Sequence, residues 1–421
     1  MLELTHAASE MEKTVHQTPA RQLIDRGRAS FVLGKAGLDA LVLTDPQNAY
    51  YASGIWPPLA RLGLNDSAVV IVPRNRSEPI AYVTYQFVYY YGVADSGWSD
   101  DIEPYLVTRP DGNSAASPSM YILNERAQVT DREHNRRERV EAAGQCYATR
   151  DEAVLAALRS RGLLRGNLGF DSLSSFMLIQ AAAPMATSRN ACDVVKYMRV
   201  VKSSTEIDLM RMASAANVKA ALSTAKKLRQ LGSIKSVRKE FFAQATALGN
   251  SPVFMSVDGV INEDYDAELK DGTAVLIDCV SHLAGYHGDY GRTIFVGDPP
   301  SNIKDAVSAI AATWAELSAQ LRPGITFSQI TSMGQEILSK TGDYRVPFGP
   351  HSVGLAHTDQ PLTDLDGKPI DLVLEPGMII SVDCPLMHSD PGGTVHMEDL
   401  VLITENGAEA IHDTSVTQII I

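Results

Sequence analysis

The chain has 421 residues, more than a single hydrophobic core usually serves, so we expect two domains. Hydrophobic residues make up 45% and charged residues 21% of the sequence, as in ordinary globular proteins. The formal net charge of −13 argues against nucleic acid or an anionic membrane as a partner, because both favour a basic surface.

The start of the chain and its cysteines predict a cytoplasmic protein. No run approaches the roughly 18 apolar residues of a membrane helix. The opening segment MLELTHAASEMEKT lacks the basic and then apolar pattern of a signal peptide. The four cysteines show neither CxxC spacing nor a dense disulfide framework, so we expect reduced thiols.

Residues 1–194 alternate between helix-like and strand-like segments, which is typical of an α/β domain. A helix over RQLIDRGRASFVLGKAGLDA precedes the strand-like run LVLTD, and similar runs follow at 68–72 and 79–85. The pattern continues through ATRDEAVLAALRSRGLL and NLGFD. The polar, charge-rich stretch 99–145 interrupts it. We interpret this stretch as a solvated surface insertion, with a lid or a dimer arm as the alternative.

Residues 195–421 form the second predicted domain. It begins just before a long helical segment that starts near Ser204 and ends near Gly232, with apolar residues at helical spacing. Further helices are expected over 302–320 and 326–340, with pairs of strands between and after them.

Two aspartates interrupt a β-prone segment, AVLIDCVSHLAGYHGDYGRTIFVG, at 274–297. Two β-rich runs flank a turn-like centre, which predicts a hairpin, and each run carries one aspartate, Asp278 and Asp289. Burying a carboxylate is costly unless it is paired or bound to a metal. Both aspartates therefore call for a cationic partner.

A second segment, MIISVDCPLMHSDPGGTVHMEDLVLITENG at 378–407, repeats this arrangement. Two β-rich runs again flank a Pro/Gly-rich turn, and they carry Asp383 and Glu398. Between the two predicted hairpins lies PFGPHSVGLAHTDQP, with His351 and His357.

Four carboxylates brought together without a cation would repel one another and raise one another's pKa values. Two divalent ions about 3.5–4 Å apart, held by shared carboxylates and a histidine, would resolve this repulsion. Alternatively, the carboxylates form separate ion pairs with nearby Arg and Lys side chains. Spacing alone leaves both interpretations open.

The order of the motifs resembles the creatinase, aminopeptidase P and prolidase family, which has the pita-bread fold. DALVLTDPQNAYYASG resembles the family's first strand and turn, and MRVVKSSTEIDLMRMASAAN its interdomain helix. The resemblance implies an α+β pita-bread catalytic domain over 195–421 and a divalent metal centre of two ions, with Mn, Fe, Co or Zn as candidates. The implied ligands are Asp278 in LIDCV, Asp289 in DYGRT, His351 in PHSVGL, Asp383 after PGMIISV and Glu398 in HMEDLVLIT.

The sequence departs from the family pattern at three places. Asp383 stands where the family has a glutamate, which is one methylene longer. The stretch 254–268, FMSVDGVINEDYDAE, lacks the histidine that contacts the substrate in the family's peptidases. His357 follows His351 by six residues in place of seven, and the usual HE becomes HTD. These departures point away from an ordinary Xaa-Pro peptidase.

The preferred function is metal-dependent hydrolysis of a C–N bond in a small molecule, similar to Xaa-Pro dipeptidases and aminopeptidases. Glu398 or Asp383 would accept a proton, and His357 would stabilise the developing oxyanion or protonate the leaving nitrogen. The alternative for His357 is a loop histidine exposed to water. The alternative functions are a lyase of the same fold, similar to dimethylsulfoniopropionate lyase, and a non-catalytic binding module.

Four residues near the predicted ligands are given structural roles. Cys279 and Cys384 each follow a ligand directly, so in a strand their side chains point to the opposite face, into the core. Arg292 is interpreted as a structural partner of carboxylates. His287 is interpreted as a turn histidine, with a supporting position beside the ligands as the alternative.

A homodimer is expected by analogy with the family, in which the N-terminal domain of a neighbouring subunit often helps to close the active site. An aromatic group in the N-terminal domain is a candidate for this role, with core packing as the alternative. Its members are Trp56, Tyr85, Tyr89, Tyr90 and Tyr91.

Overall fold

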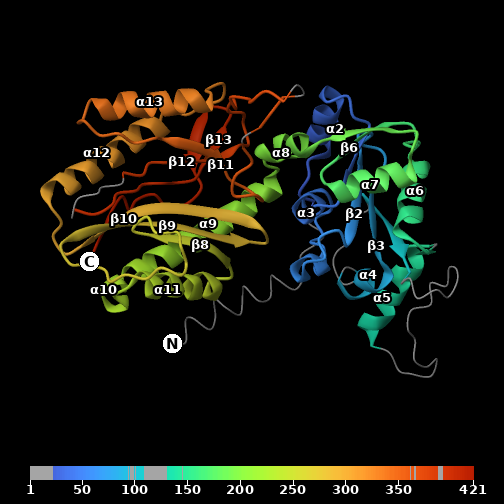
Figure 1. Cartoon of the computed structure of the whole chain (residues 1–421), viewed down its shortest axis with the longest axis horizontal. Helices are drawn as coiled ribbons and strands as arrows, with labels where there is room; N and C mark the ends of the chain where they lie inside the picture. The colour runs from blue at the N-terminus through green and yellow to red at the C-terminus, as the bar shows by residue number, and fades with distance from the viewer. Residues whose placement is uncertain are drawn as a thin grey trace. The chain divides into compact units, whose positions relative to one another are not determined.

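A computed structural model describes residues 22–92, 94, 99, 101–108, 130–144, 146–360, 362–364, 367–386 and 392–421. The chain divides into two compact units, Met1–Met198 and Arg199–Ile421 (Figure 1). Within the described ranges, no helix has the length and apolar character that a membrane crossing requires.

The first unit is built on a mixed sheet, which has seven strands among the residues described. The strand order is β5-β4-β3-β2-β1-β6-β7. The pairs β1–β2 and β2–β3 are antiparallel, and the others are parallel. The strands are β1 (Ala40–Leu43), β2 (Ala68–Pro73), β3 (Ile80–Tyr85), β4 (Ile102–Val107), β5 (Cys146–Tyr147), β6 (Asn167–Phe170) and β7 (Thr187–Asn190).

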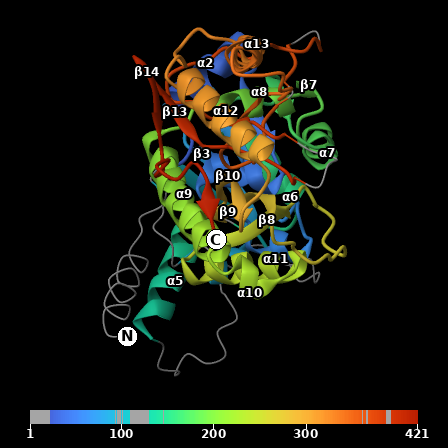
Figure 2. The same cartoon turned by 90° about the vertical axis from the view of Figure 1, so that its left-hand side faces the viewer.

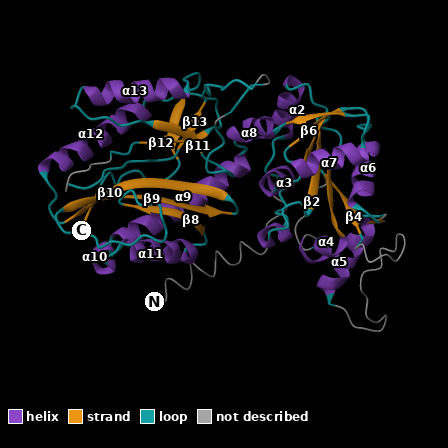
Figure 3. Ribbon diagram, viewed as in Figure 1, coloured by secondary structure: helices purple, strands orange, loops and turns teal. Residues whose placement is uncertain are grey.

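Helices cover both faces of this sheet (Figure 3). Because β1, β2 and β3 are buried on both faces, their sequences are nearly continuous apolar runs. Helices α6 and α7 pack on the face that includes Val42, Ile71 and Val83. The helices of the unit are α2 (Arg26–Lys35), α3 (Pro46–Ser53), η1 (Pro58–Leu62), α4 (Gln86–Gly92), α5 (Asp131–Ala142), α6 (Arg150–Ser160), α7 (Leu173–Ala182) and α8 (Cys192–Val200), the last of which leads into the second unit.

The stretch 99–145 is not an insertion throughout, which corrects the sequence interpretation. Ile102–Val107 forms β4, inside the sheet between β3 and β5, and Asp131–Ala142 forms α5. The run IEPYLV contains Glu103 and Pro104 and has no strict alternation, so it was too weak a signal to identify a strand within so polar a stretch. Residues 109–129 lie outside the described part of the chain, so the lid and dimer-arm alternatives are not tested there.

The aromatic group of this unit has divided roles. Tyr89 and Tyr90 are buried in the core, whereas Tyr91 is exposed. Tyr91 forms an edge-to-face contact with Tyr90.

The second unit has two four-stranded sheets among its described residues, in the orders β15-β10-β9-β8 and β11-β12-β13-β14. The strands of the first sheet are β8 (Ser251–Val257), β9 (Thr273–Leu283), β10 (Tyr286–Val296) and β15 (Ile419–Ile420). Those of the second sheet are β11 (Gly349–Ser352), β12 (Ile379–Asp383), β13 (Val401–Thr404) and β14 (Gly407–Ala410).

Helices flank the two sheets of this unit on their outer sides, as Figures 1 and 2 both show. One group covers the first sheet, and the other lies beside the second. The first group is α9 (Ser204–Ala225), α10 (Leu228–Leu231) and α11 (Ile234–Ala247), and the second is α12 (Ser301–Ser318) and α13 (Phe327–Ser339). The unit thus has an α+β fold in which two sheets face each other between layers of helices.

The predicted first hairpin is present as β9 and β10. A two-residue turn joins the strands, with Ala284 at φ 51° and Gly285 at φ 87°, and turns of this type match the twist of a hairpin. Gly288 lets α9 lie directly on the hairpin, because a Cβ atom there would come within 2.9 Å of the Ala213 carbonyl oxygen. Helix α9 therefore covers the outer face, and the inner face remains for the site.

Candidate metal centre

The inner face of the hairpin carries both predicted aspartates. In the β9–β10 register Asp278 lies opposite Gly291, and Asp289 lies two residues before Gly291 on the same strand. Directly opposed residues share a face and side chains alternate along a strand, so Asp278 and Asp289 are diagonal neighbours. The carboxylate of Asp289 is fully buried, and Asp278 is partly exposed.

The second sheet brings His351 and Asp383 to the same place. His351 of β11 pairs with Ser381 of β12, and Asp383 is the last residue of β12. Since Asp383 lies two residues beyond Ser381, both side chains share a face with His351. The Ser381 hydroxyl donates a hydrogen bond of 2.7 Å to Glu398 Oε1.

Glu398 lies where the two sheets meet. The sequence prediction placed it inside a strand, but β13 begins only at Val401. Glu398 instead forms an isolated bridge with Gly291 of β10, through backbone hydrogen bonds of 3.2 and 3.1 Å. This bridge directs the buried Glu398 side chain between the aspartates and His351.

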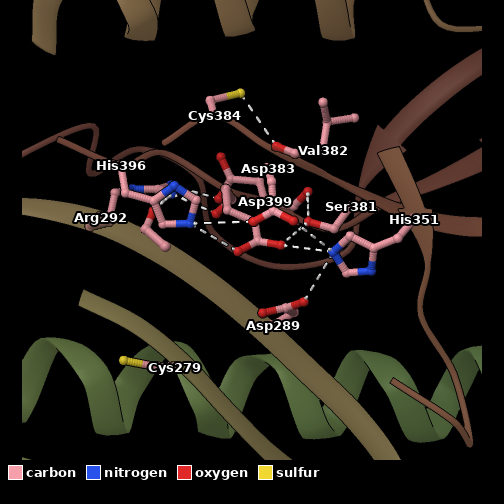
Figure 4. A network of polar contacts seen from close by, with 12 residues as sticks. Cys279, Asp289, Arg292, His351, Ser381, Val382, Asp383, Cys384, His396 and Asp399 are labelled. Carbon is pink, nitrogen blue, oxygen red and sulfur yellow. Dashed lines mark hydrogen bonds and ion pairs between the residues drawn. The ribbon is translucent and has the colours of Figure 1, made fainter. Parts of the chain in front are cut away.

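Figure 4 shows the resulting cluster, in which the imidazole of His351 points at three carboxylates. Its Nε2 atom lies 3.2 Å from Glu398 Oε1, 3.5 Å from Asp383 Oδ2 and 3.7 Å from Asp289 Oδ2. The structure thus brings the five predicted ligands together. His357 also reaches the cluster, with its Nε2 atom 2.9 Å from Asp289 Oδ2 and its side chain 41% exposed.

His396 is a member of the cluster that the sequence interpretation missed. Its Nε2 atom lies 3.1 Å from Glu398 Oε2 and 3.7 Å from Asp383 Oδ1, and its side chain is buried. The available signal was the spacing in HMED, because residues 396 and 398 share one side of an extended segment. Among the residues that the structure describes, three groups have donor atoms within 4.8 Å of one another: Asp289, His351 and His357; Asp278, His396 and Glu398; and His351, Asp383 and Glu398.

The carboxylates of the cluster perturb one another strongly. Burial and the neighbouring Glu398 raise the pKa of Asp278 to about 7 and that of Asp383 to about 6. The same causes raise the pKa of Asp289 well above its ordinary value. For Glu398, burial opposes ionisation, but hydrogen bonds from His351 and His396 outweigh it and hold its pKa well below the usual range.

A divalent cation fits this donor set. The Asp289 Oδ1 atom is buried without a hydrogen-bond partner. Among the described residues, no Lys or Arg side chain forms an ion pair with any of the four carboxylates, so the ion-pair alternative lacks its cations. Carboxylate oxygens together with imidazole nitrogens are ligands that Mn, Fe, Co and Zn all accept.

Arg292 holds the carboxylate next along the chain. Its Nη2 atom donates a 2.6 Å hydrogen bond to Asp399 Oδ1, which also contacts His412 Nε2 at 2.8 Å. The second carboxylate oxygen, Oδ2, accepts a 3.0 Å hydrogen bond from Trp314 Nε1. This is the structural role that the sequence interpretation gave to Arg292.

The cysteines and His287 lie outside the cluster. Cys279 is buried in the core that α9 and α11 form with the hairpin, and Cys384 is also buried (Figure 4). His287 lies in β10 and not in the turn, so the turn interpretation is wrong. Its ring is buried, and its Nδ1 atom is 2.9 Å from the Gly354 carbonyl oxygen.

Comparison with known proteins gives the same family as the motif order. The model of the family described as metallopeptidase family M24 matches residues 185–405. A probable dipeptidase PepE of Mycobacterium tuberculosis is 29% identical over 233 residues, which are 53% of this chain and 61% of that protein. An Xaa-Pro dipeptidase of Pyrococcus furiosus is 26% identical over 267 residues, covering 60% of this chain and 73% of the relative.

Solved structures share the fold over nearly the whole chain. The prolidase of Pyrococcus horikoshii has a TM-score of 0.62 at 19% identity, covering 93% of this chain and 98% of the prolidase. The dipeptidase PepE of Mycobacterium ulcerans has a TM-score of 0.66 at 20% identity, covering 94% and 96%. The fold is therefore an N-terminal α/β domain followed by a pita-bread domain.

Proposed function

Because the chain belongs to metallopeptidase family M24, we propose that it is a metal-dependent hydrolase that cleaves the C–N bond of a dipeptide, with Xaa-Pro dipeptides as the first candidates to test, although the three departures from the family pattern point away from an ordinary Xaa-Pro peptidase. The observation that carries this proposal is the convergence of four carboxylates and three imidazoles at one place. Among the described residues, no Lys or Arg side chain forms an ion pair with any of these carboxylates. The chain spans 61% of the length of the PepE relatives that it matches, so their activity does not transfer directly. The proposed substrate class is therefore argued from the residues of the site together with the names of the relatives.

We propose that the cluster holds two divalent ions through Asp278, Asp289, His351, Asp383 and Glu398. When bound, such ions supply Lewis acidity toward a carbonyl oxygen and lower the pKa of water. The residues of the site would bind the ions, orient the ligands and transfer protons. Glu398 accepts hydrogen bonds from Ser381 and contacts two imidazoles, so its carboxylate is held in one orientation.

Asp383, His357 and Glu398 are the proposed proton-handling groups. The Asp383 side chain is 40% exposed, so its carboxylate is accessible to a substrate, whereas Glu398 is buried behind it. His357 lies at the edge of the cluster, with Nε2 on Asp289 Oδ2 and Nδ1 3.0 Å from Thr358 Oγ1. It can therefore turn toward a substrate to stabilise an oxyanion or to protonate the leaving nitrogen.

The two alternative functions are less favoured. The relatives named above are peptidases, which favours hydrolysis over a lyase reaction. A non-catalytic module would not need four mutually repelling carboxylates, which lower the stability of a protein without a cation.

The test is metal quantification followed by a substrate screen. Protein purified without chelator is expected to contain divalent metal and to release two amino acids from an Xaa-Pro dipeptide. Glu398→Gln should lose both properties, and Glu405→Gln, at an exposed position, is the matched control. An unsaturated product from a sulfonium propionate, without dipeptide cleavage, would establish the lyase reaction. Absence of metal after reconstitution would rule out both enzymes.

Two further properties are proposed with the function. A homodimer is supported by exposed apolar side chains on the first unit, among them Leu173, Met177 and Tyr91. A monomer with full activity in sedimentation experiments at micromolar concentration would contradict it. A cytoplasmic location is supported by four free cysteines, which suit a reducing compartment.

A further inference from the structure

We propose that His396 is a direct ligand of the second ion, together with Asp278 and Glu398, and that Gly291 is glycine because the His396 ring occupies the space of its side chain. This inference rests on the proposed metal centre and adds a sixth ligand to the five that the motifs indicate. Each of the two ions then has one imidazole, His351 for the first and His396 for the second.

The position of His396 fits a shared ion. Metal–nitrogen and metal–oxygen bonds of about 2.0–2.2 Å place neighbouring donor atoms roughly 3–3.5 Å apart. The His396 Nε2 atom lies 3.1 Å from Glu398 Oε2, and a donor atom of Asp278 lies within 4.8 Å of both. The imidazole is thus at the spacing of a co-ligand before any ion is added.

The backbone of His396 is fixed where this geometry needs it. Its N–H donates a 2.9 Å hydrogen bond to Thr293 Oγ1, and its carbonyl oxygen accepts a 3.1 Å hydrogen bond from the same hydroxyl. Thr293 belongs to β10, the strand that also carries Asp289. The ring is therefore anchored to the same hairpin as the aspartate ligands.

Gly291 supplies the space that the ring occupies. A Cβ atom at this position would lie 2.2 Å from Cδ2 and 2.4 Å from Nε2 of His396. Gly291 is not among the glycines with positive φ, so the backbone does not require a glycine there. The missing side chain thus serves the imidazole, which stands directly over the partner position of Asp278.

A short Asp383 is consistent with this arrangement. The His396 Nε2 atom is 3.7 Å from Asp383 Oδ1, and the Asp383 carboxylate is at the exposed edge of the cluster. Because the Asp383 side chain is one methylene shorter than the glutamate of the family, its carboxylate lies farther from the ions. The imidazole of His396 would provide a metal-binding atom on that side. Imidazole suits Zn and Fe better than Mn, so the second position should prefer these ions.

The experiment titrates metal-free protein with Co²⁺ or Zn²⁺ and counts bound ions by elemental analysis. X-ray absorption at the cobalt edge then gives the number of imidazoles per ion. The native protein is expected to bind two ions with an average of one imidazole each. His396→Gln keeps a polar partner for Glu398, and it should weaken the second ion by more than about tenfold and reduce the average imidazole count to about one half.

Gly291→Ala perturbs the same ligand without removing it, because the added methyl group displaces the ring; the methyl group also comes within 2.9 Å of Glu398 Cβ, so this variant supports the His396→Gln result and does not replace it. It should weaken the second ion as His396→Gln does. His134→Ala, at an exposed position in α5, is the control and should change neither affinity nor imidazole count. Circular dichroism of each metal-free variant checks that the fold is retained.

Three results would overturn the inference. Unchanged affinity for both ions in His396→Gln would show that His396 is only a hydrogen-bond partner of Glu398. Two ions in the native protein with an average imidazole count of one half would show the same. A native protein that binds no ion, or only one, would remove the second position, and the former would also refute the proposed function.

Discussion

Glu398 and Asp399 are adjacent acidic residues in one extended segment, both buried, and they have opposite surroundings. Asp399 receives a donor from each of three side chains, Arg292, Trp314 and His412, at 2.6–3.0 Å. Glu398 lies among three other carboxylates. The donors around Asp399 match its charge within the fold, whereas Glu398 shares the imidazoles of His351 and His396 with three other carboxylates, a donor set that a divalent cation would balance.

The two surroundings arise from the alternation of side chains along extended chain. Gly291 and Asp289 face the cluster, and Arg292 faces the other side of β10 toward Asp399. Glu398 and Asp399 divide in the same way between the two sides. One strand and one neighbouring segment thus provide both the candidate metal centre and the buried ion pair of Arg292 with Asp399.

The largest effect is expected for Asp399→Ala, which removes the carboxylate of the buried Arg292–Asp399 ion pair. The substitution leaves the guanidinium of Arg292 buried without its carboxylate, and both side chains of that pair are fully inaccessible. Removing one partner of a buried pair costs about 3–5 kcal/mol. Urea denaturation of the metal-free protein should show this loss, and an unfolding free energy within 1 kcal/mol of the native value, on the order of a surface substitution, would contradict it.

Glu206 gives an intermediate case, in which neutral groups donate hydrogen bonds to the carboxylate and the positive charge of Lys202 also favours its ionised form. Its carboxylate accepts hydrogen bonds of 2.8 Å from the Ser203 N–H and 3.0 Å from the Tyr286 hydroxyl. Burial raises its pKa from 4.5 to about 7. The folded state therefore holds its proton more tightly than the unfolded state, and this residue lowers stability as pH rises from 4.5 to about 7.

Glu206→Gln should remove this pH dependence, because the amide does not ionise and the Tyr286 hydroxyl can rotate to accept its N–H. Relative to the native protein, the variant should gain roughly 3 kcal/mol of unfolding free energy between pH 4.5 and pH 8. Denaturation curves at both pH values measure the difference. Asp208→Asn, exposed on the same helix, is the control. An equal effect of Glu206→Gln at both pH values would refute the prediction.

Asp289→Asn should have opposite signs without and with metal. In the metal-free protein the pKa of Asp289 is raised well above its ordinary value, so the folded state holds a proton that the unfolded chain releases at neutral pH, and a neutral amide removes this cost, a gain of roughly 1–3 kcal/mol. With ions at 1,000-fold excess over the dissociation constant the native protein is stabilised by about 4.1 kcal/mol, which exceeds the metal-free gain, and the variant loses this stabilisation. Thermal unfolding with chelator and with Zn²⁺ tests the reversal of sign, which Asp399→Asn should not show.

The convergence of the candidate ligands could be predicted from sequence where a strong local pattern indicated it. Asp278 and Asp289 stand out because they interrupt apolar runs, and the strand period then places them on one face. His396 was missed because a histidine beside a carboxylate is common. Its meaning depends on the bridge from Glu398 to Gly291, which joins residues more than 100 positions apart.

The same limit applies to the fold. The long helix from Ser204 and the hairpin at 273–296 follow from strong periodicity and a two-residue turn. β4 was missed because its neighbours β3 and β5, and not its own sequence, determine that Ile102–Val107 is a strand. Pairing between distant segments is the part that propensity and spacing do not encode.

The smallest effect is expected for Asp383→Glu, which sharpens the comparison at the edge of the metal centre. Asp383 is the most exposed of the three carboxylates that contact an imidazole here, so a longer side chain should be tolerated and the unfolding free energy should change by less than about 0.5 kcal/mol. The charge is the same, so only the position of the carboxylate changes, by roughly 1.5 Å, whereas metal–oxygen distances tolerate about ±0.2 Å.

The His396 Nε2 atom already lies 3.7 Å from Asp383 Oδ1, so the added methylene pushes the carboxylate against a donor that is in place. The second ion should therefore bind up to about tenfold more weakly, which corresponds to about 1.4 kcal/mol, and calorimetric titration with Zn²⁺ resolves such a change. Tighter binding would mean that the shorter side chain leaves a ligand position incomplete, and unchanged affinity for both ions would mean that Asp383 is not a ligand.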